Sequence, residues 1–176
     1  MDRNKFEAGS LDMQHMISVL VENKFGVLAR IAGLFCGRGY NIDSLTVSPT
    51  DDSGTSKMTI VTTGDAAVIE QIEKQLTKLI DVIKVSDLTG SKFIERELAL
   101  IKVKTKTSSR AEIMQITEIF KGKIVNVYPD ELTVEISGGG DKIDAFVSLM
   151  KHFGIIELAR TGKVAIGRMS ENTASC

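Results

Sequence analysis

The residues whose types are best suited to binding a ligand lie between an apolar run and the helix predicted after it. Asn23 follows the run, and Gly26 immediately precedes the first helical residue. A helix N-terminus offers unpaired N–H groups and a partial positive charge, which suits a carboxylate. Without a Cβ atom, Gly26 lets a ligand approach this backbone closely, and the Asn23 carboxamide can donate and accept. Asn41 offers a further oxygen to an ammonium group. Spacing alone favours an ordinary turn glycine over a ligand site at Gly26.

Few other residues suggest catalysis or metal binding. The chain has two histidines and two cysteines, with no CxxC, HExxH, spaced acidic loop or nucleophile motif. His15 and His152 are therefore predicted to be structural, and no catalytic or metal-binding residue is expected. The glycines at 138–140 precede a predicted helix but lack the Lys-Ser/Thr of a phosphate loop, which favours a flexible linker.

The composition excludes several classes of protein. The 176 residues include 22 Lys+Arg and 23 Asp+Glu, a formal net charge of −1, and 43% are hydrophobic. This balance argues against a disordered chain and against nucleic acid or an anionic membrane as the main partner. No apolar run approaches a membrane span, and the N-terminus lacks a signal-peptide core. Cys36 is predicted to be a small buried residue and Cys176 a tail thiol, which suits the cytoplasm.

The periodicity of the first half predicts the framework that positions these residues. Residues 15–21 form the apolar, β-branched run of a buried strand. A helix follows, and Gly39 is expected as the left-handed cap at its end. The apolar stripe of this helix is Val27, Leu28, Ile31, Leu34 and Phe35. The remaining elements predicted in this half are strands over residues 41–49 and 56–63, a helix capped by Asp65, and a strand at 82–85.

The second half repeats this order of elements. Its predicted elements are a strand at 97–103, a helix around 113–120, strands at 124–127 and 132–136, a helix around 143–153 and a last strand within 155–166. Strand, helix, strand, strand, helix, strand is the split-βαβ pattern. The predicted fold class is therefore α+β, with two ferredoxin-like βαββαβ units in tandem. The predicted domains are a loose extension over 1–13, a first unit over 14–89, a second over 90–168 and a tail over 169–176.

Two segments around the candidate residues resemble a known family. Residues 21–31 and 38–47, the latter beginning Arg-Gly-Tyr-Asn-Ile, look like an ACT domain. More narrowly, they resemble the regulatory (small) subunit of acetohydroxyacid synthase, also called acetolactate synthase. Weaker matches, among them residues 56–60 and 159–162, extend the resemblance over about 15–168.

The resemblance implies a non-catalytic subunit that activates a separate large subunit and confers feedback inhibition by valine in branched-chain amino acid biosynthesis. The large subunit is expected to carry thiamine diphosphate, a divalent metal and FAD, and this chain no cofactor of its own. In the family, the effector lies between the ACT domains of a homodimer, at positions corresponding to Asn23, Gly26 and Asn41. The first unit would bind the effector, and the second would assemble with the large subunit.

The side-chain chemistry agrees with these expectations. The N–H groups near Gly26 suit the carboxylate of valine, and asparagine oxygens suit its ammonium group. The apolar neighbours expected to enclose the isopropyl group are Val27, Leu28 and Ile42. Lys24 and Phe25 depart from the family, many of whose members have an acidic residue and a serine there, and Phe25 is expected to narrow the pocket.

Two other functions remain open from the sequence. A free-standing ACT-type sensor of another enzyme or a transcription factor would share the turn chemistry, but its second unit would not need to resemble this family. An enzyme with an unrecognised site is a third class. The sequence also leaves open whether leucine or isoleucine replaces valine.

Overall fold

The chain divides into two compact units. The structure is a computed structural model, and it describes residues 13–168. The boundary lies between Lys92 and Phe93, and we refer to the N-terminal unit and the C-terminal unit. The predicted extension, apart from Met13, and the predicted tail lie outside the described residues. Both units are mixed α+β with antiparallel sheets, which confirms the predicted fold class.

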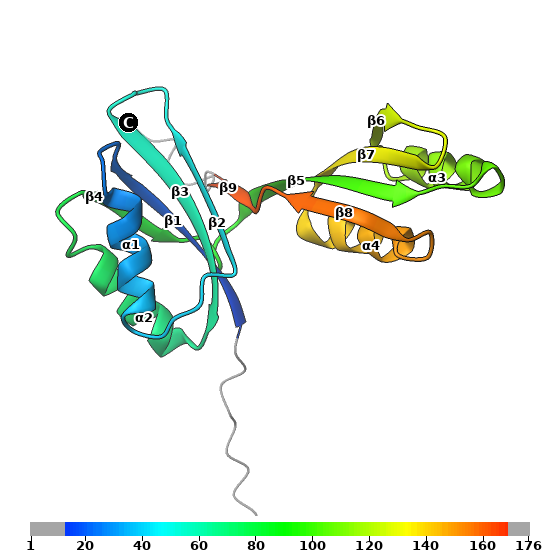
Figure 1. The fold of residues 1–176 in the computed structure, drawn as a ribbon. Coiled ribbons are helices and arrows are strands. Elements are labelled where there is room, and N and C mark those ends of the chain that lie inside the picture. The colour runs from blue at the N-terminus through cyan, green and yellow to red at the C-terminus, as the bar shows by residue number, and fades with distance from the viewer. Residues whose placement is uncertain (1–12, 169–176) are drawn as a thin grey trace, which may run out of the picture. The chain divides into compact units, whose positions relative to one another are not determined.

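The N-terminal unit is a βαββαβ plait. Its elements are β1 (Met13–Glu22), α1 (Val27–Cys36), β2 (Ser44–Pro49), β3 (Thr55–Gly64), α2 (Ala66–Leu76) and β4 (Val82–Asp87). The four strands are ordered β2-β3-β1-β4 and pair antiparallel. Both helices cover the same face of this sheet (Figure 1).

Alternation along β1 explains why one face of this sheet is buried. Ile17, Val19 and Val21 are fully buried at every second position, because successive strand side chains point to opposite faces. They pack in one cluster with the inward stripes of the two helices. The buried helix residues are Val27, Ile31 and Phe35 of α1 and Ile69, Ile72 and Leu76 of α2.

Both predicted helix-end signals are present in the N-terminal unit. The Asp65 side chain caps α2 by accepting from the Val68 N–H at 2.8 Å. α1 ends at Cys36, and Gly39 has a φ of 71°, which a residue without a Cβ adopts at little cost. The Tyr40 N–H then donates to the Phe35 carbonyl at 3.0 Å, so the chain turns away from the helix there.

Two details of the N-terminal unit differ from the prediction. Cys36 is exposed, not buried, because it lies one residue beyond Phe35 and so faces about 100° away from the buried stripe. The second strand begins at Ser44, not at Asn41, since the side chains of Asn41 and Asp43 bond to each other at 2.7 Å in the preceding bend.

The C-terminal unit repeats the plait with one addition. Its elements are β5 (Phe93–Lys104), α3 (Thr107–Ile119), β6 (Lys123–Val127), β7 (Glu131–Gly138), α4 (Gly140–Met150), β8 (Ile155–Arg160) and β9 (Val164–Gly167). The main order is β6-β7-β5-β8, and β9 pairs with the first four residues of β5. The predicted last strand is therefore two strands, separated by residues 161–163, in which Gly162 has a φ of 82°.

The core of the C-terminal unit lies on one face of β5. Ala99, Ile101 and Val103 are fully buried and pack in one cluster with residues of both helices. Phe120 and Phe146 meet edge to face within this cluster, with ring centroids 5.4 Å apart. Ile113 of α3 and Ile143 and Met150 of α4 are fully buried in the same cluster.

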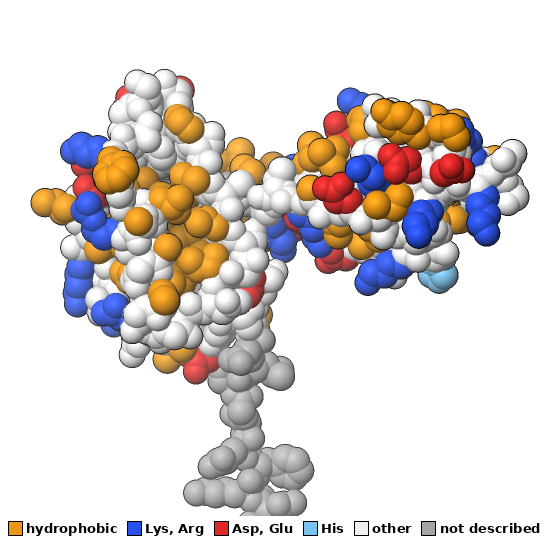
Figure 2. Space-filling view, in the orientation of Figure 1, with side chains coloured by type: hydrophobic (Ala, Val, Ile, Leu, Met, Phe, Trp, Pro, Cys, Tyr) orange, Lys and Arg blue, Asp and Glu red, His pale blue; other side chains and the backbone are white. Residues whose placement is uncertain are grey.

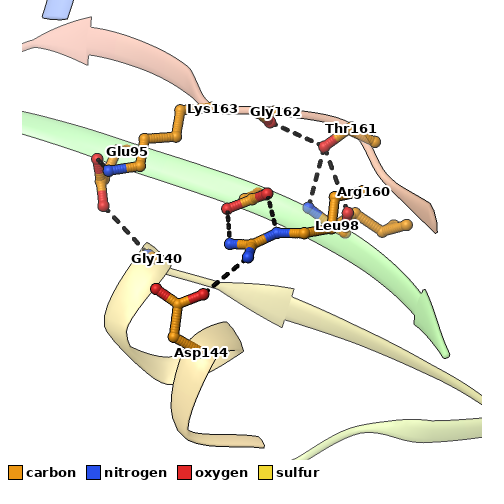
Figure 3. Close-up of polar contacts among 9 residues, drawn as sticks. Glu95, Leu98, Gly140, Asp144, Arg160, Thr161, Gly162 and Lys163 are labelled. Carbon is orange, nitrogen blue, oxygen red and sulfur yellow. Dashed lines mark hydrogen bonds and ion pairs between the residues drawn. The ribbon is translucent and has the colours of Figure 1, made fainter. Parts of the chain in front are cut away.

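The glycines at 138–140 form a tight junction, so the prediction of a flexible linker is wrong. Gly138 ends β7 and Gly140 begins α4. The Gly140 N–H donates to Oε1 of Glu95 at 3.2 Å, and Nζ of Lys163 lies 3.4 Å from Oε2 of the same carboxylate (Figure 3). A carboxylate of the chain itself thus satisfies the N-terminus of α4, where a helix favours negative charge.

Arg160 joins β8 to β5 and α4. Its Nε and one Nη atom donate to the Glu97 carboxylate at 2.6 and 2.8 Å, and the other Nη atom donates to Asp144 at 2.7 Å (Figure 3). The hydrogen bonds to Glu97, more than any other contact, raise the pKa of the Arg160 guanidinium. Because the Glu97 side chain is only 5% exposed, loss of Arg160 would leave a buried carboxylate without a charged partner.

We expect Arg160→Met to destabilise the C-terminal unit by about 2–3 kcal/mol, because the substitution leaves the buried Glu97 carboxylate without its guanidinium. Urea unfolding of the full chain followed by circular dichroism measures this change. Lys102→Met is the matched control: Lys102 pairs with the largely exposed Glu157, so its removal should leave the unfolding midpoint unchanged. Equal unfolding midpoints for the two variants would contradict the role of Arg160.

Candidate functional site

The turn between β1 and α1 is held in place by the loop between β2 and β3. The Asn23 N–H donates to the Gly54 carbonyl at 2.8 Å, and Nδ2 of Asn23 donates to the Ser53 carbonyl at 3.0 Å. Gly26 is the N-cap of α1 with a φ of 83°, in the left-handed region. The turn therefore favours glycine at this position, because a residue with a Cβ atom is strained at this φ.

Among the described residues, no side chain caps the N-terminus of α1. Gly26 has no side chain to cap the helix, no other described side chain caps it, and the first turn contains no acidic residue. The N–H groups of this turn and the positive end of the helix dipole are consequently suited to an external carboxylate. In this respect α1 differs from α4, whose N-terminus binds Glu95.

Two ion pairs flank this turn. Nζ of Lys24 lies 2.7 Å from the Glu22 carboxylate, whose hydrogen bond and charge raise the pKa of the lysine. The Arg30 guanidinium, one turn into α1, donates to Oδ2 of Asp81 in the turn before β4. Each pair thus joins a cation and an anion of the chain beside the turn.

The predicted apolar residues have different surroundings. Val27 is buried in the core, and Ile42 packs against that core, so neither is a freely exposed pocket wall. Leu28 is 42% exposed beside the turn. Phe25 is fully exposed, so within one chain it does not narrow a pocket.

Asn41 lies at the other end of the N-terminal unit. Its carbonyl accepts from Oγ1 of Thr62 at 2.6 Å, and Thr62 pairs with His15 near the start of β1. Asn23 and Gly26, in contrast, follow the last residue of β1, Glu22.

The strand geometry gives the separation of the two groups. From His15 to Glu22, β1 rises about 23 Å, at about 3.3 Å per residue. An amino acid is far shorter, since one fully extended residue spans at most about 3.6 Å. The structure therefore brings Asn23, Gly26, Val27 and Leu28 together and places Asn41 and Ile42 elsewhere. One ligand can contact both groups only if they come from two chains.

Sequence reasoning missed Arg30 and Asp81. They are 51 positions apart, and their pairing depends on how the turn before β4 packs beside the end of β1. The only signal in the sequence was the position of Arg30, one helical turn after Gly26.

The histidines contact nearby groups within their own units. Nδ1 of His15 lies 3.4 Å from Asp87, and Nδ1 of His152 lies 3.2 Å from the Leu149 carbonyl.

Over residues 13–168, no three His, Cys, Asp or Glu side chains gather in a way that could hold a metal ion. No helix in this part of the chain is long and apolar enough to cross a membrane. On the face seen in Figure 2, acidic and basic side chains are interspersed on the C-terminal unit.

Each unit matches a model of a protein family. Residues 17–84 match the ACT domain of the AHAS small subunit-like group. Residues 96–169 match the model described as the small subunit of acetolactate synthase. The two matches together include the β1–α1 turn and the ion pairs that Arg160 forms with Glu97 and Asp144.

Similar proteins cover most of the chain. The acetolactate synthase small subunit of Aquifex aeolicus is 57% identical over 88% of this chain and 81% of its own length. The isozyme 3 small subunit of Escherichia coli is 48% identical over 89% of this chain and 96% of its own. A crystal structure of the small subunit from Thermotoga maritima, 43% identical, superposes with a TM-score of 0.82 over 90% of this chain and 99% of that one. The predicted resemblance is thereby confirmed: the chain belongs to the acetolactate synthase small subunit family.

Proposed function

We propose that this chain is the regulatory subunit of an acetolactate synthase, without catalysis of its own, and that its N-terminal unit binds valine as a feedback inhibitor. The observation that carries the proposal is the uncapped N-terminus of α1 behind a left-handed Gly26, in a unit that matches the ACT domain of this family. Membership of the family supports a catalytic subunit as the partner. That subunit would work in the cytoplasm and carry thiamine diphosphate, a divalent metal and FAD.

The turn supports binding of the carboxylate of valine. N–H groups at the start of α1 would donate to its oxygens, and Gly26 leaves room for it beside the backbone. The exposed part of Leu28 would contact the isopropyl group. The Asn23 side chain, whose Nδ2 donates to Ser53, has its carbonyl oxygen available for the ammonium group.

The separation of Asn41 from this turn supports a site shared by two chains. In a dimer, Asn41 and Ile42 of one copy would complete the site at the Gly26 turn of the other. Valine binding would then favour one arrangement of the two ACT units, and the coupling to the catalytic subunit would amount to about 1–3 kcal/mol, as is typical of allosteric pairs. The C-terminal unit would provide the contact that activates the catalytic subunit.

Gly26→Asp should weaken valine binding at least about tenfold. An L-residue is strained at a φ of 83°, and the new carboxylate would lie where the ligand carboxylate docks. Isothermal titration calorimetry measures the affinity, and the variant should still activate the catalytic subunit. Gly90→Asp is the matched control, because a Cβ there meets nothing within 4 Å and the backbone needs no positive φ. Normal valine binding by Gly26→Asp would contradict the assigned site.

A mixture of two defective variants tests whether two chains share the site. Asn23→Ala and Asn41→Ala should each lose valine binding when alone. When the two are co-expressed, half of randomly formed dimers are mixed, and each mixed dimer has one intact site. Calorimetry should therefore recover roughly a quarter of the high-affinity sites. If the mixture binds no better than either variant alone, the shared site is wrong.

Activity measurements test the role as a regulatory subunit. The purified chain should form no acetolactate from pyruvate, should raise the rate of a co-purifying catalytic subunit, and should make that rate sensitive to valine. The Gly26→Asp variant provides the control, because it should raise the rate without conferring sensitivity. Turnover of pyruvate by the chain alone would contradict the proposal, and capture of an unrelated enzyme or a transcription factor would favour a free-standing sensor.

A further inference from the structure

The ion pair between Arg30 and Asp81 lies directly beside the Gly26 turn. Arg30 is the fourth residue of α1, and its Nη1 donates to Oδ2 of Asp81. The two side chains differ in exposure: that of Asp81 is 12% exposed and that of Arg30 is 50% exposed. One member of the pair is therefore fixed within the unit while the other remains accessible from solvent.

Asp81 has little freedom to move. Its carbonyl accepts from the Glu22 N–H at 2.9 Å, which ties the turn before β4 to the last residue of β1. The next residue, Val82, pairs with Val21 in the sheet. A carboxylate held in this way restricts the orientation of the guanidinium that it binds.

The free edge of the guanidinium lies beside Gly26. A Cβ atom built on Gly26 would have Nη2 of Arg30 as its nearest neighbour, at 3.8 Å. Because Asp81 binds Nη1, Nη2 is the atom nearest to the space that the missing side chain leaves open. A carboxylate docking on the N–H groups of α1 would enter this space.

We propose that Arg30 is a direct ligand of the effector carboxylate and that Asp81 is the residue that positions it. This inference rests on the proposed function, since it names a further contact in the same site. The carboxylate would receive N–H donors from the α1 backbone and a charge-assisted donor from Nη2 of Arg30. The planar guanidinium can bind Asp81 through one nitrogen and the ligand through another, which the single ammonium of a lysine does less well. The site would thereby select free amino acids over their amides.

The test compares four variants of the full chain by calorimetry with valine: Arg30→Met, Arg30→Lys, Asp81→Asn and the double variant Arg30→Met/Asp81→Asn. Arg30→Met should lose about 10- to 100-fold in affinity, the range for a hydrogen bond to a charged group. Arg30→Lys should recover part of the loss because the charge returns, and Asp81→Asn should lose less than Arg30→Met because the guanidinium remains. Arg38→Met, at an exposed arginine after α1, should bind valine like the parent chain.

The double variant distinguishes a ligand from a structural residue. Removing Arg30 alone leaves the buried Asp81 carboxylate unpaired, which would lower the thermal unfolding midpoint without ligand. The double variant leaves no unpaired charge, so its midpoint should return toward that of the parent while valine binding stays weak. If the double variant regains parental affinity, Arg30 acts only on stability and the proposal is overturned. If the parent chain and Arg30→Met bind equally well while Gly26→Asp does not bind, the inference fails and the proposed site stands. If the parent itself does not bind valine, both fail.

Discussion

The packing of α1 against β1 determines where every candidate residue lies. The buried side chains of β1 and the stripe of α1 form one core, so the helix must return across the sheet beside the strand that precedes it. The turn that carries Gly26 is therefore at one end of the sheet, and Asn41, which follows the helix, is at the other. This constraint makes a shared site between two chains the only arrangement in which both groups reach one small ligand.

The same fold appears twice in the chain with different chemistry at the helix ends. In the N-terminal unit, a left-handed glycine leaves the start of α1 without a cap, and the guanidinium of Arg30 lies next to it. In the C-terminal unit, Glu95 occupies the start of α4 and Arg160 binds the buried Glu97. The first arrangement suits a ligand that binds reversibly at the start of α1. In the second arrangement, side chains of the unit itself satisfy both the start of α4 and the buried Glu97 carboxylate.

The sequence predicted best those features that depend on neighbours a few positions apart. The buried positions Val27, Ile31 and Phe35 of the α1 stripe, the Asp65 cap and the left-handed Gly39 were confirmed, because each depends on contacts within one or two turns. Leu28 of the same predicted stripe is 42% exposed. Errors arose where a position lies at the border of a pattern. Cys36 follows the last buried residue of its helix and faces outward. The final predicted strand is two strands, because the backbone between them takes a left-handed φ at Gly162.

By itself, the sequence determined the two plaits, the absence of catalytic motifs and the chemistry of the Asn23–Gly26 turn. Local periodicity and residue type suffice for these features. Only the tertiary structure decided that Asn41 lies far from that turn, that Asp81 binds Arg30, and that Glu95 occupies the start of α4. The physical reason is that such contacts join residues about 20 to 50 positions apart. They depend on which strands pair and on which turns lie beside them, and the local periodicity of the sequence does not specify either.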